Sequence, residues 1–207
     1  MVNWSPPFVG FPKIARLSRE VIVTEKIDGT NAQILVSDDG SDLVAGSRTT
    51  WLTPERDNHG FAKWVQANRE ELLRLGPGRH FGEWWGSGIN LGYGLAKGEK
   101  RFSLFNVHRW GTLARKAMSS TGEEYDEFYT DRPACCHAVP VLWRGSMDHI
   151  ERALGAVFED LRQNGSRAAP GFMRPEGVVV FHTAANICFK KTLDGDGQPK
   201  TLAKESK

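Results

Sequence analysis

Apolar and polar residues alternate near the start of the chain in a pattern that predicts a β-strand ending at a lysine. Residues Val21–Ile27 read VIVTEKI, with β-branched side chains first and an apolar residue again after Lys26. Such residues with a period of two favour a half-buried strand. Ala32–Val36 completes a predicted hairpin, and the turn sequence SDDG then leads into a third predicted strand, Leu43–Arg48.

The rest of the chain predicts two helices and several further strands. A helix over residues 59–75, capped by Asp57-Asn58 and ended by Gly76, has apolar residues on one face. A second helix has apolar residues at helical spacing between Ile150 and Leu161 and ends at Gly165. The predicted strands are His80–Trp85, Phe102–Trp110, Val139–Trp143, Gly177–His182 and Ile187–Lys191.

The remaining segments predict irregular structure around one α+β domain. Residues 1–20 predict a lead-in with one helical turn near Ile14–Leu17, residues 114–133 predict a loop, and residues 166–175 predict a linker. Because the strands outnumber the helices and follow one another as hairpins, the expected fold class is α+β with largely antiparallel sheets and flanking helices.

Composition narrows the class of protein without naming a function. The 207 residues are 40% hydrophobic and 25% charged, as in ordinary globular proteins. The sequence lacks an apolar run of the length needed to span a membrane, and its start does not resemble a signal peptide, so a cytoplasmic protein is expected. The cysteines Cys135, Cys136 and Cys188 lack disulfide or zinc spacing. A net charge of +2 permits a nucleic-acid partner if the cations cluster.

Lys26 is the first candidate for chemistry. Burial at a strand end and neighbouring cations expose the lone pair of a lysine, which makes it a nucleophile. Gly29 allows the backbone and a ligand to approach closely. An exposed lysine that opens a hairpin is the alternative. The sequence Lys26-Ile27-Asp28-Gly29 resembles the first motif of the covalent nucleotidyltransferases, polynucleotide ligases and mRNA capping enzymes, whose lysine takes a nucleoside monophosphate on its ε-nitrogen.

Further motifs of that family follow in order. Arg48, in the sequence AGSR, matches a motif whose arginine contacts the nucleotide or its phosphate, and a guanidinium presents a planar fork to phosphate oxygens. Glu83, in the sequence FGE, matches a motif whose glutamate binds the ribose. A charge among aromatic residues is costly unless it has a partner, so a ligand or a cation such as Arg79 is expected beside Glu83.

The resemblance also implies a stacking ring, a metal ligand and phosphate-binding lysines. Phe105 would stack on the purine, although Asn106 stands where relatives often have aspartate. Glu176 would hold a divalent metal, Mg²⁺ or Mn²⁺, which takes a few carboxylates together with phosphate oxygens and water. Lys190 and Lys191 would contact the α-phosphate, although the family pattern Lys-x-Lys would place its second lysine at position 192, which is a threonine.

The residues around Lys26 complete the implied nucleotide site. Glu25 would accept a hydrogen bond from the adenine amino group, Ile27 lies next to the lysine, and Asn31 would contact the ribose or a phosphate. A glycine-rich segment at residues 86–92 lacks the spacing and the following helix of a dinucleotide cradle, and a Walker-type phosphate loop is absent from the sequence.

Five weak motifs in the family's order, spread over residues 20–192, make a strong joint signal. The phrases LGYGL and LWRG resemble the phage and bacterial RNA-ligase branch. The resemblance implies a nucleotidyltransferase (ATP-grasp-like ligase) fold, with residues 1–207 as a single adenylation domain and no separate OB-fold or C-terminal module.

The implied activity is an ATP-dependent RNA ligase that joins 5′-phosphate and 3′-hydroxyl ends through a covalent lysyl-AMP. The implied partners are RNA ends or a nicked duplex, together with a partner protein that supplies end binding, and no membrane is involved. A capping guanylyltransferase that uses GTP and a catalytically degenerate nucleic-acid-binding module are the two alternatives.

Overall fold

The fold is built from two main sheets and a separate hairpin. A computed structural model describes residue 5 and residues 7–118 and 124–194. The strands of this part are β1 Glu20–Lys26, β2 Thr30–Val36, β3 Leu43–Ser47, β4 Trp51–Leu52, β5 Gly78–Gly86, β6 Lys100–Leu104, β7 Leu113–Met118, β8 Glu124–Tyr129, β9 Cys136–Ala138, β10 Val141–Ser146, β11 Gly177–His182 and β12 Ile187–Thr192. They form a four-stranded sheet (β10-β1-β11-β12), a six-stranded sheet (β4-β3-β2-β5-β6-β9) and the hairpin β7-β8.

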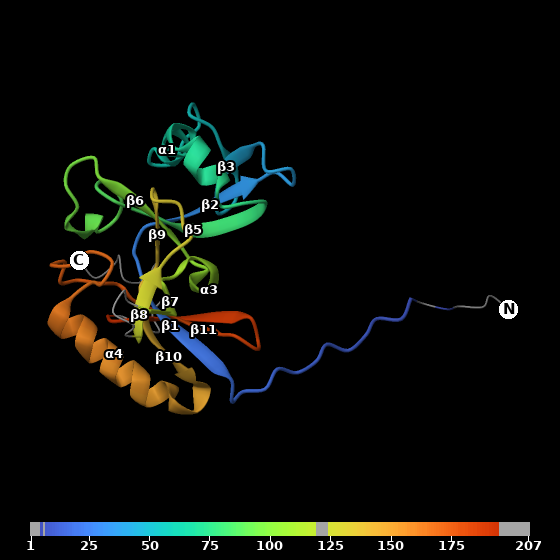
Figure 1. Cartoon of the computed structure of the whole chain (residues 1–207), viewed down its shortest axis with the longest axis vertical. Coiled ribbons are helices and arrows are strands. Elements are labelled where there is room, and N and C mark those ends of the chain that lie inside the picture. The colour runs from blue at the N-terminus through green and yellow to red at the C-terminus, as the bar shows by residue number, and fades with distance from the viewer. Residues whose placement is uncertain (1–4, 6, 119–123, 195–207) are drawn as a thin grey trace, which may run out of the picture.

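Helices cover the outer faces of the two main sheets (Figure 1). The helical elements are α1 Phe61–Ala67, α2 Arg69–Leu73, η1 Gly92–Gly94, α3 Val107–Trp110, η2 Met147–His149 and α4 Ile150–Asn164. Neighbouring strands are antiparallel except for β6 and β9. The α+β class with largely antiparallel sheets, expected from the sequence, is therefore confirmed. The described helices include none that is long and apolar enough to cross a membrane.

The six-stranded sheet buries one face against α1. Every second residue of β2, from Ala32 to Val36, enters this core. The ring of Phe61 in α1 lies 5.4 Å from that of Trp84 and 5.2 Å from that of Phe102, between ring centroids. Aromatic pairs at this spacing add to the stabilisation from burial. Alternation therefore assigns the odd-numbered residues of β2 to the opposite face.

The two faces of β1 have different neighbours, and this decides where Lys26 points. Val21 and Val23 pack against α4, whereas Ile22 belongs to a cluster with Trp85 of β5 and Tyr93 of η1. Because side chains alternate along a strand, Lys26 shares the face of Ile22, which is turned toward the six-stranded sheet.

The chain after β6 differs from the sequence prediction. A strand over Phe102–Trp110 was expected, but β6 ends at Leu104 and α3 begins at Val107. The side chain of Asn106 accepts a hydrogen bond from the backbone nitrogen of Arg109 at 3.2 Å. This is the geometry of an N-cap, which starts a helix despite the apolar sequence around it.

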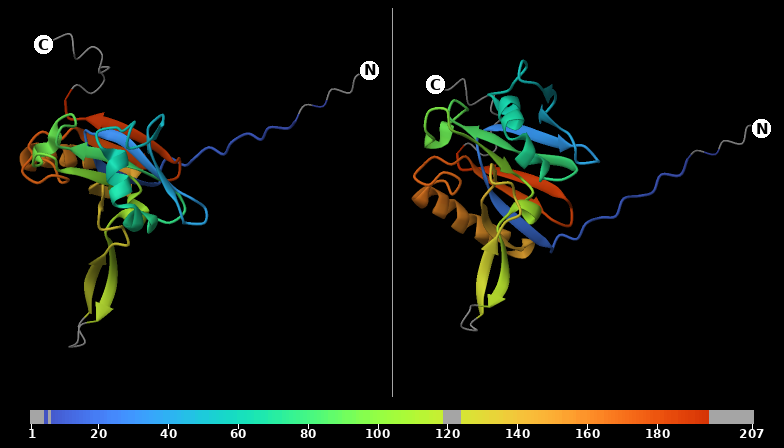
Figure 2. Two further views of the ribbon diagram at one scale, coloured as in Figure 1. Left: turned by 90° about the horizontal axis from the view of Figure 1, so that it is seen from above. Right: turned by 45° about the horizontal axis from the view of Figure 1, so that its top comes forward.

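Two other segments also differ from the prediction: one contains a hairpin in place of a loop, and the other lacks a predicted helical turn. The expected loop at residues 114–133 contains most of the hairpin β7-β8, which projects from the body (Figure 2), while residues 119–123 lie outside the described part. The helical turn expected at Ile14–Leu17 is absent, and the exposed segment around it runs away from the body (Figure 1).

The predicted helix at residues 59–75 is present as two short helices. The carboxylate of Asp57 caps the first of them, as predicted, by accepting hydrogen bonds from the backbone nitrogens of Ala62 at 2.7 Å and Lys63 at 3.1 Å. The break falls at Asn68, whose side chain donates to the backbone oxygen of Trp64 at 2.8 Å. The backbone nitrogen of Asn68 also donates to that oxygen, at 3.1 Å, so the side chain adds a second bond to the same acceptor where the two helices join.

Replacing Phe61 with alanine should lower the free energy of unfolding by about 3–5 kcal/mol, because the substitution leaves a cavity among buried rings. Phe8, which is 94% exposed, supplies the matched control. Phe8→Ala should change the free energy by less than about 0.5 kcal/mol. Urea unfolding followed by circular dichroism measures both values, and equal effects of the two substitutions would contradict this packing.

Candidate active site

Lys26 ends β1 at a point where three segments meet. The register of β1 with β11 sets Lys26 opposite Gly177, directly after Glu176. The Nζ atom of Lys26 forms an ion pair with the carboxylate of Glu176. Their side chains are 21% and 11% exposed, so both charges are largely removed from water. Removing either charge would leave the other one buried without a partner, which is costly.

The turn after Lys26 is held from the η1 segment. Asn90 donates from its side-chain nitrogen to the carboxylate of Asp28 at 3.0 Å and to the backbone oxygen of Gly29 at 2.7 Å. The hydroxyl of Tyr93 accepts from the backbone nitrogen of Asp28 at 3.0 Å and lies 3.4 Å from the backbone oxygen of Lys26. These contacts fix the backbone on which the lysine stands.

Sequence reasoning missed Asn90 and Tyr93 as parts of the site. Their backbones have positive φ angles of 44° and 50°, which non-glycine residues seldom adopt. The sequence LGYGL, which includes Tyr93 and directly follows Asn90, was the signal that could have pointed to them, but it was used only as a sign of a family branch. The glycine-rich segment at residues 86–92, rejected as a phosphate cradle, instead supports the lysine turn.

Glu83 lies on β5 beside the same turn. Its two carboxylate oxygens accept hydrogen bonds from the backbone nitrogen of Gly29 at 3.1 Å and from the side chain of Asn31 at 2.9 Å. Burial raises the pKa of Glu83 to about 7, against the opposing effects of Asn31, nearby Lys26 and Gly29. A side chain at position 29 would lie 2.5 Å from the backbone oxygen of Trp84, so the close approach requires glycine.

The register of β12 separates the two adjacent lysines. Lys190 pairs with Val179, which in turn pairs with Thr24, so Lys190 lies on the face of Lys26. Lys191 lies on the opposite face, where its Nζ atom is 5.5 Å from the ring centroid of Phe158 in α4. The prediction that both lysines contact the nucleotide therefore does not fit this geometry for Lys191. Thr192 is the second residue on the Lys190 side.

Glu25 has a different environment from the one predicted. Its carboxylate accepts hydrogen bonds from the hydroxyl of Ser166 at 2.6 Å and from the backbone nitrogens of Arg167 at 2.8 Å and Ala168 at 2.9 Å. The residue is 1% exposed, and burial raises its pKa against the effect of these bonds. In this structure Glu25 anchors the loop after α4 and does not present an open acceptor to a base.

The other predicted site residues differ in how far they are exposed to solvent. Ile27 is buried with Trp85 and Tyr93. Phe105 is 42% exposed and follows β6 directly. Arg48 is exposed and follows β3 directly, at the end of the six-stranded sheet where β2 begins with Thr30 and Asn31.

A metal would have to share its coordination with a ligand. The described residues contain no group of three or more histidine, cysteine, aspartate or glutamate side chains that could hold an ion alone. Mg²⁺ and similar ions usually take one or two carboxylates and complete their shell with water and phosphate oxygens. Burial is the main cause of the raised pKa of Glu83, and the charge of Glu176 adds a smaller effect in the same direction, so the two carboxylates are close enough to fit that kind of site.

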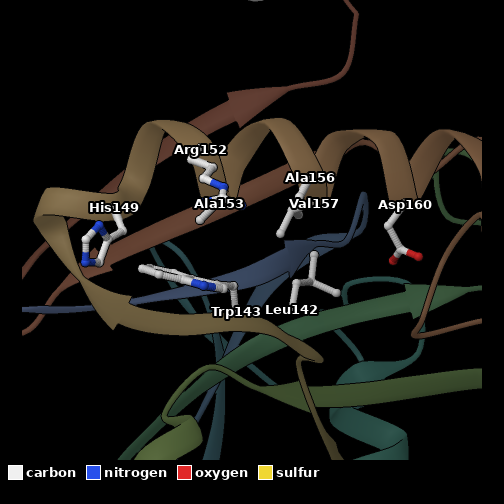
Figure 3. Close-up of a pocket in the computed structure, with 8 residues that line it drawn as sticks. All are labelled: Leu142, Trp143, His149, Arg152, Ala153, Ala156, Val157 and Asp160. Atoms are coloured by element: carbon white, nitrogen blue, oxygen red, sulfur yellow. The ribbon is translucent and has the colours of Figure 1, made fainter.

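A groove between α4 and β10 is separate from this centre (Figure 3). Leu142, Trp143 and Val157 line it. Val157 packs on the face of β1 that carries Val21 and Val23, so the groove lies on the other side of that sheet from Lys26. The groove is therefore not a binding site for the lysine chemistry.

The arrangement can support attack by an amine on an electrophile that carries negative charge. Lys26 supplies the nitrogen, Glu176 and Glu83 supply carboxylates within its electrostatic reach, and Lys190 supplies a further cation on the same face. Phosphoryl groups are the substrates for which such cations and carboxylate-bound metals are used.

Solved structures with a similar fold are RNA ligases. A Naegleria gruberi RNA ligase variant with AMP and Mn is 19% identical, with a TM-score of 0.54 over 91% of this chain and 57% of the other. Another variant of that enzyme, with ATP and Mn, is 18% identical, with a TM-score of 0.50 over 84% and 49%. An archaeal ATP-dependent RNA ligase is 18% identical, with a TM-score of 0.53 over 88% and 48%.

The fold is therefore shared with part of these RNA ligases, and this chain spans about half the length of these proteins. No curated protein matches the chain in a sequence search. The family model described as RNA ligase matches residues 19–192, which include every residue of the centre around Lys26. The chain belongs to the RNA ligase family.

Proposed function

We propose that this protein is an ATP-dependent RNA ligase that works through a covalent lysyl-AMP. The observation that carries the proposal is the contact of the Lys26 amine with Glu176 at a strand end that also adjoins Glu83. An amine held beside carboxylates that suit a metal and phosphates is what nucleotidyl transfer requires. ATP with Mn in a similar solved RNA ligase supports the choice of nucleotide and metal.

The reaction would proceed in three displacements at phosphorus. The Lys26 nitrogen attacks the α-phosphorus of ATP, the bond to the β-phosphate oxygen breaks, pyrophosphate leaves, and the nitrogen gives up a proton. An RNA 5′-phosphate oxygen then attacks the same phosphorus and releases the lysine. Finally the 3′-hydroxyl attacks the activated 5′-phosphate and AMP leaves. Covalent catalysis of this kind divides one difficult step into easier ones.

Glu176 has two functions in this scheme. With no nucleotide present, its carboxylate neutralises the Lys26 ammonium. A divalent metal, when bound, would polarise the phosphate oxygens and offset their charge. Glu176 would be one of the residues that hold this metal, and a carboxylate so engaged would no longer pair with the Lys26 amine, which would then be open to attack the α-phosphorus.

The surrounding residues would position the nucleoside and the phosphates. Glu83 and Asn31 would contact the ribose, the half-exposed ring of Phe105 would stack on the purine, and Lys190, on the face of Lys26, would contact the phosphates. Arg48 at the end of β3 would contact an outer phosphate. Glu25 would act indirectly: it would hold the loop after α4 in place and would not bind adenine.

The chain is proposed to act as one adenylation domain. The solved RNA ligases that it resembles are about twice as long, so a further module or a partner protein would help to bind the RNA ends for sealing. The adenylation step depends only on the residues described above, and it is therefore the step to test first.

Incubation with α-phosphate-labelled ATP and Mg²⁺ tests the proposal. The wild type should acquire covalent label, Lys26→Ala should acquire none, and a nicked RNA duplex should be sealed. Labelling by GTP in place of ATP would favour a capping guanylyltransferase. Absence of label with either nucleotide, for a wild type that is folded by circular dichroism, would favour a degenerate binding module.

The two neighbouring lysines form a matched pair for a second prediction. Lys190→Ala should lower the rate of label transfer by about 100-fold, because a cation at the developing phosphate charge is worth several kcal/mol in a dry site. Lys191→Ala should change the rate by less than about threefold, since Lys191 lies over Phe158 on the other face. Single-turnover labelling measures both rates, and a larger loss from Lys191→Ala would reverse the assignment.

The raised pKa of Glu83 gives a prediction for stability against pH. The folded protein keeps the proton of Glu83 up to a pH of about 7, whereas the unfolded chain releases it near 4.5. The contribution of Glu83 to stability is therefore full below pH 4.5 and falls as the pH rises to 7, by at most about 3 kcal/mol. Glu83→Gln lacks this dependence.

The measurement is the difference in unfolding free energy between wild type and Glu83→Gln, taken by urea titration from pH 4.5 to 7.5. The difference should shift steadily in favour of the variant as the pH rises, and other titrating groups cancel in it. A constant difference would mean that Glu83 titrates normally in the folded protein.

A further inference from the structure

The face of the six-stranded sheet opposite α1 carries a row of exposed aromatic side chains. Trp51 of β4 is 47% exposed and Phe81 of β5 is 52% exposed. Phe81 alternates with His80 and Gly82, which are both buried, so it stands on the face turned away from the helical core. Large exposed rings gathered on one sheet face indicate a binding surface.

Strand register places these rings in line. Phe81 pairs with Gln33 of β2, Gln33 pairs with Gly46 of β3, and Gly46 pairs with Trp51. At the other end, the backbone nitrogen of Phe105 donates to the backbone oxygen of Phe81 at 2.9 Å, which continues the row to the ring that is proposed to stack on the purine. We call Trp51, Gln33, Arg79 and Phe81 the aromatic platform.

The platform is already ordered before a ligand binds. A side chain at Gly46 would lie 2.9 Å from Cγ of Gln33 and 3.0 Å from the ring of Trp51, so the absent side chain lets the indole lie close to the sheet. The guanidinium of Arg79 is 5.2 Å from the centroid of the Trp51 ring and donates to the side-chain oxygen of Gln33 at 2.9 Å. Groups held in place lose little entropy on binding.

Charge on this face favours a polyanion. Arg79 and Arg48 are both exposed and stand on either side of the row. The carboxylate that follows along β5 is Glu83, which is buried within the candidate active site. Rings that offer π-faces, together with arginines that reach phosphates, are the composition of surfaces that bind single-stranded nucleic acid.

We propose that the aromatic platform binds a single-stranded stretch of RNA beside the ligation site. Bases stack on Trp51 and Phe81, and Arg79 and Arg48 contact the phosphates between them. Phe105 would lie between the platform and the nucleotide, because it is hydrogen-bonded to Phe81 and its ring is proposed to stack on the purine. The inference deepens the proposed function, since it rests on RNA being the substrate and assigns a place for the strand that leads to the reacting end.

Fluorescence anisotropy with a dye-labelled single-stranded 12-nucleotide RNA tests the platform. Trp51→Ala and Phe81→Ala should each raise the dissociation constant about tenfold, as the loss of one stacked base does. Arg79→Gln should reduce the slope of binding against salt by about one counterion. Label transfer from ATP, measured without RNA, should stay within about twofold of wild type in all three variants.

Phe189→Ala is the matched control, because Phe189 is a 56% exposed ring on β12 of the other sheet. Its RNA affinity should equal that of the wild type. The proposal is overturned if the platform variants bind RNA as tightly as the wild type, or if Phe189→Ala weakens binding as much as they do. It is also overturned if sedimentation shows that the wild type is a dimer and Trp51→Ala a monomer, since the platform would then be an interface between two copies of the chain.

The two proposals fail separately. A wild type that takes no label from ATP, yet loses RNA affinity in the platform variants, would remove the ligase function and keep the platform. If the wild type takes label from ATP but the platform variants bind RNA as tightly as it does, the ligase function is kept and the platform is removed.

Discussion

The ion pair between Lys26 and Glu176 is the contact on which the rest of the site depends. Two charges that are mostly withdrawn from water hold the end of β1 against the start of β11, and they persist because each neutralises the other. The pair also bears on the proposed chemistry, which would need the Lys26 amine to be released from the carboxylate. The supports around it, from Tyr93 and Asn90 to the backbone contact of Gly29 with Glu83, keep the turn in one geometry. Preorganised groups of this kind lower the cost of reaching the transition state.

Much of this centre could be predicted from the sequence because its parts depend on local patterns. The period of two between Val21 and Ile27 predicted β1 with Lys26 at its end, and β1 runs from Glu20 to Lys26. The strand β11 and the helix α4 were also predicted, because their apolar spacing matches their burial, and the predicted hairpin partner β12 is present although its apolar residues are exposed. Glycine at position 29 was predicted to allow a tight backbone and the approach of a ligand. Its closeness to the backbone oxygen of Trp84 confirms the tight backbone, and the approach of a ligand stays a prediction. Order along the chain then identified the family before any distance was known, and the family match over residues 19–192 confirms it.

The features that could not be predicted depend on tertiary register or on a single side chain. Periodicity alone does not say which of two adjacent lysines faces the nucleotide, whereas pairing of β12 with β11 assigns Lys190 to one face and Lys191 to the other. The buried partners of Glu25 lie more than a hundred residues away in the sequence, so its anchoring role had no local signal. The helix α3 replaced a predicted strand because Asn106 caps it, and a single cap can outweigh apolar alternation.

Peptide mass mapping tests the central claim most directly. The protein is incubated with ATP and Mg²⁺, digested under conditions that preserve a phosphorus–nitrogen bond, and searched for a peptide whose mass has increased by one AMP. The account predicts that fragmentation places the AMP on Lys26 alone. An AMP found on another lysine, or a protein that binds ATP but is recovered unmodified, would contradict it.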